Sequence, residues 1–556
     1  MSPRTPTPTT IHRLAVYLVA LLTGTLLFVT FGAGPAGADS YVQIQGEGSS
    51  WSANAINQWI ADEQSIGMRV DYTANGSTAG RIDFINGKTD FAATDIPFQT
   101  DPTDGSAPEH PQAGSYAYMP ITAGGTVFMY NLTINGQRVT NLRLSGPNIA
   151  KIFTGAITNW DDPALAADNP GLKLPNQAIV PVVRSDGAGS SYELSEWMIS
   201  QDPSLWNSYC SRSGRAPACG PTSFYPTVTG MIAQSGDLGV AGYVSQSYAN
   251  GAIGYVEYSY ALNDHFPVAQ VLNAAGYYTE PTAQNVAVSL LAAQVDTTDV
   301  NNPALYLTQK LENVYTDPDP RTYPLSSYSY LILPTTVGGS FTAAKGHTLA
   351  KFSYDAMCQG QQQSALLGYS PMPINLVEAS FAQIAKIPGA DVESINIQSC
   401  NNPTFTPNGT NLLAATAPNP PACDKQGPTQ CTNGTGGAAS VSTPVSAGSP
   451  AAAAASSAGS SKAAATGAVG STSGGTSAGG GATPTTTAPC DPTTGDCSVS
   501  VAIGLAGAAP APDPVTLAVA QGWSVNQSLL VLIGLVLLVI ILIPGLLVRR
   551  TNRRKT

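Results

Sequence analysis

The sequence predicts an α/β fold of two lobes, followed by a disordered stalk and one transmembrane helix. Three observations lead to this prediction. Patterns typical of strands and of short helices alternate over residues 39–405, whereas residues 406–527 consist largely of Ala, Ser, Gly, Thr and Pro. Residues 528–548 are uncharged and mostly apolar. Alternating strands and helices favour an α/β fold, and the globular region is too long for one small sheet.

The helix predicted over Ala53–Glu63 is the clearest element, because Ile56, Trp59 and Ile60 recur at helical spacing. The other predicted helices are Arg81–Ile85 and Tyr192–Ile199. The predicted strands are Tyr41–Gln45, Met68–Tyr72, Phe91–Ala93, Ile179–Arg184, Gly251–Glu257 and Tyr328–Leu333.

The N-terminus predicts a secretory signal peptide over residues 1–38. Arg4 and Arg13 supply a positive start, Leu14 to Thr30 is apolar, and Ala36-Gly37-Ala38 is a small-residue cleavage site. The alternative interpretation is a retained N-terminal anchor.

The C-terminus predicts a membrane anchor. Residues 528–548 are long enough to span a hydrocarbon layer of roughly 30 Å. The tail that follows, residues 549–556, carries Arg549, Arg550, Arg553, Arg554 and Lys555. Basic residues beside a membrane helix favour the cytoplasmic side. We therefore expect a single-pass protein of the cell membrane, with its globular region extracellular and its C-terminus cytoplasmic.

The stalk, residues 406–527, is predicted to be flexible, because a segment with so few large apolar residues cannot offset the entropy of ordering. It contains two short cysteine loops, 423–431 and 490–497. Their expected role is only to stiffen or protect the stalk.

The cysteine content indicates disulfides, because an even number in an exported chain is typical of them. Adjacent pairing is our prediction, although the spacing alone leaves the connectivity open. The predicted pairs are Cys210 with Cys219, Cys358 with Cys400, Cys423 with Cys431, and Cys490 with Cys497. A zinc site is disfavoured, since no CxxC occurs and the four histidines are scattered.

The charge balance argues against a nucleic-acid partner. The chain has 35 acidic and 24 basic residues, a formal net charge of −11. Several of the basic residues lie in the two end segments, which hold no acidic ones, so the region between is more acidic still. Affinity for nucleic acid depends on Lys and Arg that neutralise phosphates.

Three segments share one design: a strand, a turn of small residues with hydroxyls, and a helix. They are residues 46–51, 75–80 and 186–191. A helix N-terminus leaves N–H groups unpaired and carries partial positive charge. Three such termini directed at one point would bind an anion without much net positive charge. The alternative is that each hydroxyl only caps its helix.

Three charged residues lie close to these turns. Arg184 ends a predicted strand and can offer several donors to an oxyanion, while Asp186 can hold its guanidinium still. The alternative role of Arg184 is a surface ion pair. Asp95 follows another strand, and its alternative role is a cap or a turn. In an anion site, Asp95 would accept a hydrogen bond from a protonated oxyanion such as phosphate and repel sulfate, which carries no proton.

These motifs resemble those of the phosphate-specific substrate-binding proteins of bacterial phosphate ABC transporters, members of the periplasmic binding protein superfamily. The similarity covers most of residues 40–405. The segments that carry it are GEGSSW (46–51), NGSTAG (75–80), TDFAATDIP (89–97), the long stretch 149–192, GAIGYVEYSYA (251–261) and YPLSSYSYLILP (323–334). The resemblance implies a hinged two-lobed fold over residues 39–405 that closes on inorganic phosphate.

The resemblance also implies which residues bind. The phosphate-binding positions it gives are Ser50, Trp51, Ser77, Asp95, Arg184, Gly189 and Ser190, with Asp186 as the partner of Arg184. Ala188 is a departure, because the family usually carries a hydroxyl there. A lost hydrogen bond to a charged ligand would weaken binding by about 10- to 150-fold.

The predicted function is a membrane-tethered receptor that delivers phosphate to an ABC permease, with no cofactor, metal or catalytic residue. The permease and the ATPase would be separate partners, since the chain lacks a GxxxxGK[ST] motif. A surface enzyme such as a phosphatase is disfavoured, because few histidines and no metal cluster are present. The remaining alternative is an adhesion or sensing protein that keeps the fold but not phosphate binding, as Ala188 and the long stalk would allow.

Overall fold

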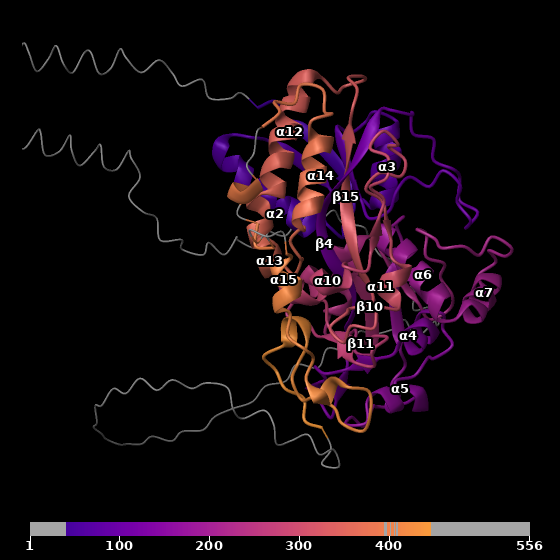
Figure 1. Cartoon of the computed structure of the whole chain (residues 1–556). Helices are drawn as coiled ribbons and strands as arrows, with labels where there is room; N and C mark the ends of the chain where they lie inside the picture. The colour runs from indigo at the N-terminus through magenta and orange to yellow at the C-terminus, as the bar shows by residue number, and fades with distance from the viewer. Residues whose placement is uncertain (1–40, 394–396, 401, 405, 407–409, 446–556) are drawn as a thin grey trace, which may run out of the picture. The chain divides into compact units, whose positions relative to one another are not determined.

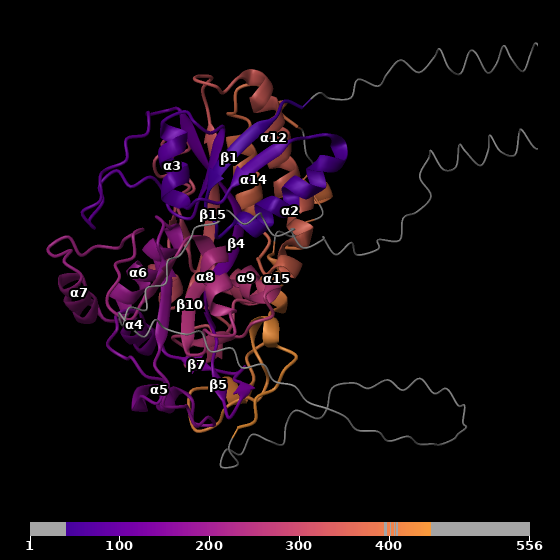
Figure 2. The same ribbon diagram turned by 180° about the vertical axis from the view of Figure 1, so that it is seen from behind.

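The computed structural model describes residues 41–393, 397–400, 402–404, 406 and 410–445. One twisted sheet runs through two lobes (Figure 1, Figure 2). Its strand order is β2-β1-β3-β15-β4-β10-β8-β9, and β11 joins it at β4 and carries β7 and β12. We call the part built on β1, β2 and β3 lobe 1 and the part built on β8, β9 and β10 lobe 2.

Lobe 1 has parallel strands covered by helices. Its strands are β1 (Ile44–Gly48), β2 (Val70–Thr73) and β3 (Phe91–Thr94). Its helices are α2 (Ala53–Glu63), α3 (Ser77–Ile85), α12 (Ala343–Met357), α13 (Ser364–Leu367) and α14 (Ile374–Ile384), with short 3-10 turns η1 (Gln64–Ile66), η2 (Gln359–Gln363) and η3 (Ile397–Cys400).

Lobe 2 repeats this organisation with more irregular connections. Its main strands are β7 (Arg143–Leu144), β8 (Val180–Arg184), β9 (Ile232–Gln234), β10 (Ala252–Glu257), β11 (Val268–Leu272) and β12 (Tyr278–Thr279). Its helices are α4 (Gly146–Phe153), α5 (Pro163–Asp168), α6 (Gly189–Gln201), α7 (Pro203–Arg212), α8 (Gly236–Val244), α9 (Tyr258–Asn263), α10 (Ala283–Ser289) and α11 (Glu312–Tyr315). Two small strand pairs are β5 (Thr133–Ile134) with β6 (Gln137–Arg138), and β13 (Gln294–Val295) with β14 (Gln309–Lys310).

Two long strands join the lobes. β4 (Tyr116–Tyr130) is buried along its whole length, and it pairs antiparallel with β15 (Ser326–Pro334) and with β10. The register of the β4–β15 pair shifts between Ser329 and Tyr330. These two strands cross from one lobe to the other (Figure 1), so the lobes are connected through the middle of the sheet.

The structure confirms every strand and helix that the sequence predicted, with ends displaced by a few residues. The α/β two-lobed architecture is confirmed as well. The longest strand, β4, was not predicted, because it lacks alternating polar residues and contains Gly124 and Gly125. A strand buried on both faces shows no period of two. At Gly125 a Cβ atom would lie 2.3 Å from the Cβ atom of Pro281, so only glycine fits there.

The predicted end of the globular region at residue 405 is wrong. Residues 410–445, which we call the C-terminal strap, pack on lobe 2 and contain α15 (Leu412–Thr416), η4 (Ala422–Asp424) and η5 (Gly436–Ala438). The first predicted cysteine loop therefore belongs to the globular region and not to a stalk. In Figure 1 the strap is the orange segment beside α10 and below β11.

Polar contacts hold the strap in place. The buried Arg143 donates to the backbone oxygens of Thr429, at 2.8 Å, and Cys423, and it pairs with Asp424 at 3.1 Å. The Thr140 N–H donates to Thr443 Oγ1 at 2.8 Å. Composition does not indicate this docking, because composition reports apolar area and polar contacts hold the strap.

Three of the four predicted disulfides are confirmed: Cys210–Cys219, Cys358–Cys400 and Cys423–Cys431. The pair Cys490–Cys497 lies outside the described residues, as do the signal peptide, residues 446–527 of the stalk, the apolar segment 528–548 and the basic tail. Within the described part of the chain, no helix is both long and apolar enough to span a membrane.

We predict that Arg143→Met destabilises the folded protein by about 3–5 kcal/mol, because breaking a buried ion pair leaves an uncompensated charge. The Arg143 side chain is fully buried and Asp424 is nearly so. Chemical denaturation monitored by fluorescence would measure the change. Lys88→Met is the matched control, since Lys88 pairs with Asp83 on the surface. Equal stability of the two variants would contradict the importance of the strap.

Candidate functional site

The three predicted turns follow β1, β2 and β8, and they meet where the lobes face each other. The first two belong to lobe 1 and are tied together, because the Gly76 N–H donates to Gly48 O at 2.8 Å. The third belongs to lobe 2, and the Thr78 N–H donates across to Gly187 O at 3.0 Å. At Gly76, where φ is 99°, a Cβ atom would lie 2.5 Å from Asp186 Oδ2.

The helices that follow these turns begin without side-chain caps. The residues before α2, α3 and α6 are Ser52, Gly76 and Ala188, and none accepts a capping hydrogen bond with its side chain. No side chain at these three positions caps its helix, although Ser49 Oγ in the first turn accepts from the Trp51 N–H at 3.1 Å. Some N–H groups at these helix starts are already used, because the Thr78 N–H donates to Gly187 O and the Trp51 N–H donates to Ser49 Oγ. An uncapped helix start nevertheless favours an anion.

Asp95 occupies the centre of the site and is 2% exposed. Its Oδ1 accepts from Ser49 Oγ at 2.7 Å and from Ser329 Oγ at 2.8 Å. Its Oδ2 accepts from Ser77 Oγ at 3.0 Å. Burial raises the pKa of Asp95, and the three hydroxyls only partly oppose this effect.

The backbone of Gly189 lies against the side chain of Asp95. A Cβ atom at Gly189 would lie 2.7 Å from the Asp95 Cβ and Oδ2 atoms. Any larger residue at the start of α6 would push the carboxylate out of its place. The glycine thus lets a helix of lobe 2 approach a carboxylate of lobe 1.

Arg184 lies at the end of β8 and is 2% exposed. Its Nε donates to Asp186 Oδ1 at 2.8 Å and its Nη2 to Asp186 Oδ2. Its Nη1 donates to Asp237 Oδ2 at 2.6 Å. Burial alone would lower the pKa of Arg184, but the two carboxylates raise it, so the guanidinium stays charged.

Asp186 is also fixed from the backbone. The Gly236 N–H donates to its Oδ1 at 2.9 Å. Burial would raise the pKa of Asp186, yet Arg184 and this N–H together hold it below the ordinary range. The predicted pairing of Arg184 with Asp186 is therefore present.

Ser50 and Ser190 complete the hydroxyl lining. Ser50 Oγ donates to Asp237 Oδ2 at 2.5 Å and accepts from the Asp237 N–H at 3.0 Å. Ser190 Oγ accepts from Arg184 Nη1 at 3.4 Å. Beside them, Ala188 presents only a methyl group, and its N–H donates to Ser223 O at 2.9 Å.

Trp51 forms part of the wall of the site. Its indole is buried, and its Nε1 donates to Thr126 Oγ1 on β4 at 3.1 Å. Its ring meets Tyr369 edge-on, with centroids 5.9 Å apart. A Cβ atom at Gly124 would lie 2.8 Å from the indole, so the strand that joins the lobes passes directly beside this ring.

The structure brings all the predicted site residues together and adds three more: Ser49, Asp237 and Ser329. Asp237 stands at the start of α8 after β9, a fourth strand–turn–helix of the kind that identified the other turns. Its sequence, Gln234-Ser235-Gly236-Asp237, could have been found by the same search. Ser329 has no such signal, because its place depends on the pairing of β15 with β3 and β4.

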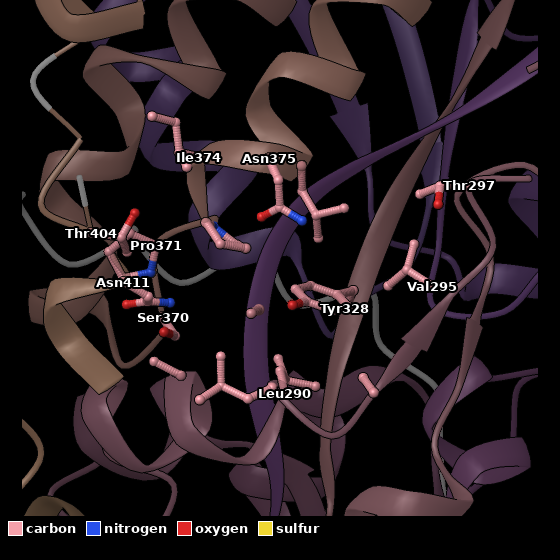
Figure 3. Close-up of a pocket in the computed structure, with 16 residues that line it drawn as sticks. Leu290, Val295, Thr297, Tyr328, Ser370, Pro371, Ile374, Asn375, Thr404 and Asn411 are labelled. Carbon is pink, nitrogen blue, oxygen red and sulfur yellow. The ribbon is translucent and has the colours of Figure 1, made fainter. Parts of the chain in front are cut away.

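A separate cavity of about 390 Å³ lies between α10, α14 and the long strands (Figure 3). Tyr328, Leu290 and Ser370 belong to its lining, which contains no charged side chain. This cavity shares no lining residue with the candidate anion site. Among the described residues no cluster of His, Cys, Asp and Glu could hold a metal ion.

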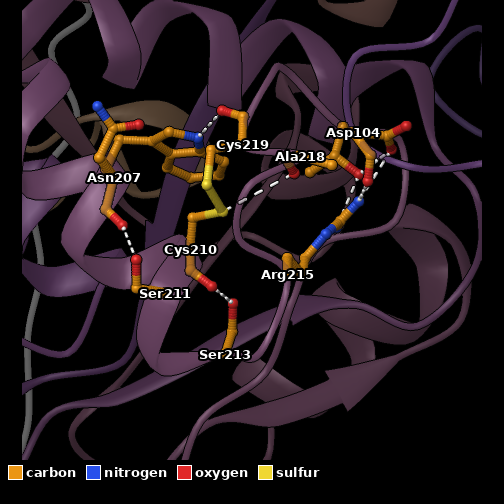
Figure 4. The surroundings of a disulfide bond; sticks show 10 residues. Asp104, Asn207, Cys210, Ser211, Ser213, Arg215, Ala218 and Cys219 are labelled. Carbon is orange, nitrogen blue, oxygen red and sulfur yellow. Dashed lines mark hydrogen bonds and ion pairs between the residues drawn. A yellow bond between two sulfur atoms is a disulfide. The ribbon is translucent and has the colours of Figure 1, made fainter.

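A second contact between the lobes, which we call the interlobe latch, lies outside the site. Arg215, in the loop closed by the Cys210–Cys219 disulfide of lobe 2, donates from Nη2 to Asp104 Oδ2 of lobe 1 at 3.0 Å (Figure 4). Thr222 Oγ1 donates to the same oxygen at 2.6 Å. The disulfide loop thus holds a loop of lobe 1 against lobe 2.

Comparisons with known proteins identify relatives of this chain. A family model described as a PBP superfamily domain matches residues 33–356. The phosphate-binding protein PstS of Xylella fastidiosa is 30% identical over 338 residues, which cover 61% of this chain and 83% of that protein. PstS 2 of Mycobacterium tuberculosis is 27% identical over 348 residues, which cover 60% of this chain and 83% of that protein.

Among solved structures, the phosphate-binding protein from Stenotrophomonas maltophilia is 19% identical, with a TM-score of 0.46 over 66% of this chain and 99% of that one. The fold and the buried interlobe site define a two-lobed binding protein of the PBP superfamily. Within that class, the chain belongs to the family of the PstS phosphate-binding proteins.

We predict that Arg215→Ala increases amide hydrogen exchange in residues 99–109 by about 5- to 30-fold. A lost charge-assisted hydrogen bond costs about 1–2 kcal/mol, and exchange follows the free energy of local opening. Mass spectrometry of the exchanged full-length chain would measure the change. Arg212→Ala is the control, because Arg212 donates to Thr154 O within lobe 2. Unchanged exchange in Arg215→Ala would contradict the latch.

Proposed function

We propose that the protein is an extracellular receptor that binds inorganic phosphate between its two lobes. One observation carries this proposal: a buried carboxylate, Asp95, lies where three helices begin without side-chain caps. Helix N-termini favour an anion, whereas a carboxylate repels one unless the anion carries a proton. A protonated tetrahedral oxyanion satisfies both requirements.

The donors for such a ligand would come from both lobes. Ser50 and Ser77 of lobe 1 and Ser190 of lobe 2 can each turn a hydroxyl towards it. Arg184 keeps N–H groups beyond those that its two carboxylates use. Because both lobes contribute, the ligand would stabilise the closed arrangement, and domain closure around a ligand is a common mode of binding-protein action.

The selectivity would rest on Asp95. Phosphate near neutral pH keeps at least one O–H, which can donate to the carboxylate. Sulfate has no proton at that pH and would leave two anionic groups facing each other in a buried site. A site that leaves a buried polar group unpaired rejects the wrong ligand strongly.

The membership in the PstS family supports a role in import. The receptor would deliver phosphate to an ABC permease whose ATPase is a separate subunit. Residues 528–548 would tether it to the cell membrane in a single pass, with the lobes outside and the basic tail in the cytoplasm. A tether keeps the receptor near the permease at high effective concentration. No cofactor or catalytic group enters this proposal.

The proposal is tested by calorimetry on the purified full-length chain in detergent, after partial unfolding has removed any bound phosphate. We expect phosphate to bind with micromolar or tighter affinity and sulfate to give no heat of binding. Asp95→Asn is expected to weaken phosphate binding by about 10- to 150-fold, the equivalent of one charge-assisted hydrogen bond, and to reduce the discrimination against sulfate. Asp161→Asn, a change on the surface of lobe 2, is the control.

A folded protein that binds neither anion would overturn the phosphate proposal. Ala188 would be the physical reason for that outcome, because its methyl group leaves the start of α6 without one hydroxyl donor. The protein would then be an adhesion or sensing protein that keeps the fold alone.

The tether makes a separate prediction. Deleting residues 528–556 should release the chain into the culture medium and lower phosphate uptake by intact cells, although phosphate affinity of the released chain stays the same. Cell fractionation and uptake of labelled phosphate would measure both effects. If the truncated chain stays in the membrane fraction, the assignment of the anchor is wrong.

A further inference from the structure

Asp237 is a second buried carboxylate of the site. It lies in the first turn of α8 in lobe 2 and is fully buried. Its Oδ2 accepts from Arg184 Nη1 at 2.6 Å and from Ser50 Oγ of lobe 1 at 2.5 Å. Its Oδ1 accepts from the Glu257 N–H at 2.8 Å. Asp237 therefore contacts two of the residues that would bind phosphate.

Four hydroxyl protons of the site are already donated to carboxylates. Each serine hydroxyl has one proton to donate. Ser50 gives its proton to Asp237, while Ser49, Ser77 and Ser329 give theirs to Asp95. When Ser50 turns its proton towards a phosphate oxygen, Asp237 Oδ2 loses a donor. A proton on the ligand is then the available replacement.

The charges of the site also favour a protonated ligand. Arg184 is the cation in contact with Asp237, and it also pairs with Asp186. Asp95 adds a third carboxylate, and its interaction with Asp237 contributes to the raised pKa of Asp95. With one guanidinium against three carboxylates, a dianion would meet an excess of negative charge that burial does not screen.

The other titratable groups around Asp237 do not change this balance. Glu257 lies behind it on β10, and burial raises the pKa of Glu257 well above the ordinary value, which favours its neutral form. Burial also raises the pKa of the Tyr260 and Tyr369 hydroxyls, so both stay neutral. None of the three supplies positive charge.

We propose that Asp237 makes the site specific for phosphate in a doubly protonated complex, in which one proton lies between the ligand and Asp95 and a second between the ligand and Asp237. This inference rests on the proposed function and deepens it: the species bound is dihydrogen phosphate, or hydrogen phosphate together with one proton from solution. One proton is shared with a carboxylate of lobe 1, Asp95, and the other with a carboxylate of lobe 2, Asp237.

The proton count gives a measurable consequence. Below the second ionisation of phosphate, the free ligand already carries two protons and binding takes up none. Above it, the free ligand carries one proton, so the complex must take up about one more from the buffer. The apparent affinity for total phosphate should then fall about tenfold for each pH unit.

The experiment is calorimetric titration of the full-length chain with inorganic phosphate in buffers of different ionisation enthalpy. Titrations at about pH 5.5 and about pH 8.5 lie on either side of that ionisation. For the unaltered chain we expect uptake near zero at the lower pH and about one proton per phosphate at the higher. Asp237→Asn, which keeps the size of the side chain, should bring uptake at the higher pH near zero. Asp161→Asn should behave like the unaltered chain.

The outcomes separate the two proposals. If phosphate binds but the unaltered chain takes up no proton at the higher pH, this inference is wrong and the phosphate receptor stands. Uptake of one proton that persists in Asp237→Asn also overturns it. Absence of phosphate binding at both values of pH overturns the proposed function itself. The measurement on the unaltered chain does not depend on the folding of any variant.

Discussion

The burial of Arg184 is the constraint on which the site depends. A guanidinium removed from water is stable only when its charge is paired and its N–H groups are used. Asp186 and Asp237 meet this requirement from two different turns of lobe 2, and Asp237 in turn binds Ser50 of lobe 1. The positions of β8, of α8 and of the first turn of lobe 1 are thus coupled through one ion cluster, and the closed arrangement of the lobes includes it.

Short local motifs made most of the site predictable. The turns near Ser50, Ser77 and Ser190 each lie between a strand and a helix that the sequence indicates, so their meeting at the ends of parallel strands follows from the fold class. The position of Ser329 in the site cannot be predicted from a local motif. It lies 234 residues from Asp95, and its hydroxyl reaches that carboxylate only through the pairing of β15 with β3, next to the shift in register on β4.

The strap shows a different limit of prediction from sequence. Composition measures how much apolar area a segment can bury, and residues 410–445 have little of it. Their docking depends instead on single polar contacts with distant partners, such as those of Arg143, which the sequence does not pair with Asp424. The disulfide Cys423–Cys431 then closes the loop that these contacts hold. Order in such a segment becomes evident only when the surface that receives it is known.

The attachment of the strap also determines how mechanical force enters the molecule. A pull on the chain beyond residue 445 would reach Thr443 and the buried Arg143 ion pair first, and all of these contacts are made to lobe 2. Lobe 2 would therefore act as the fixed body and lobe 1 as the moving one. A load applied there would pass through the strap before it reaches the turns that form the site.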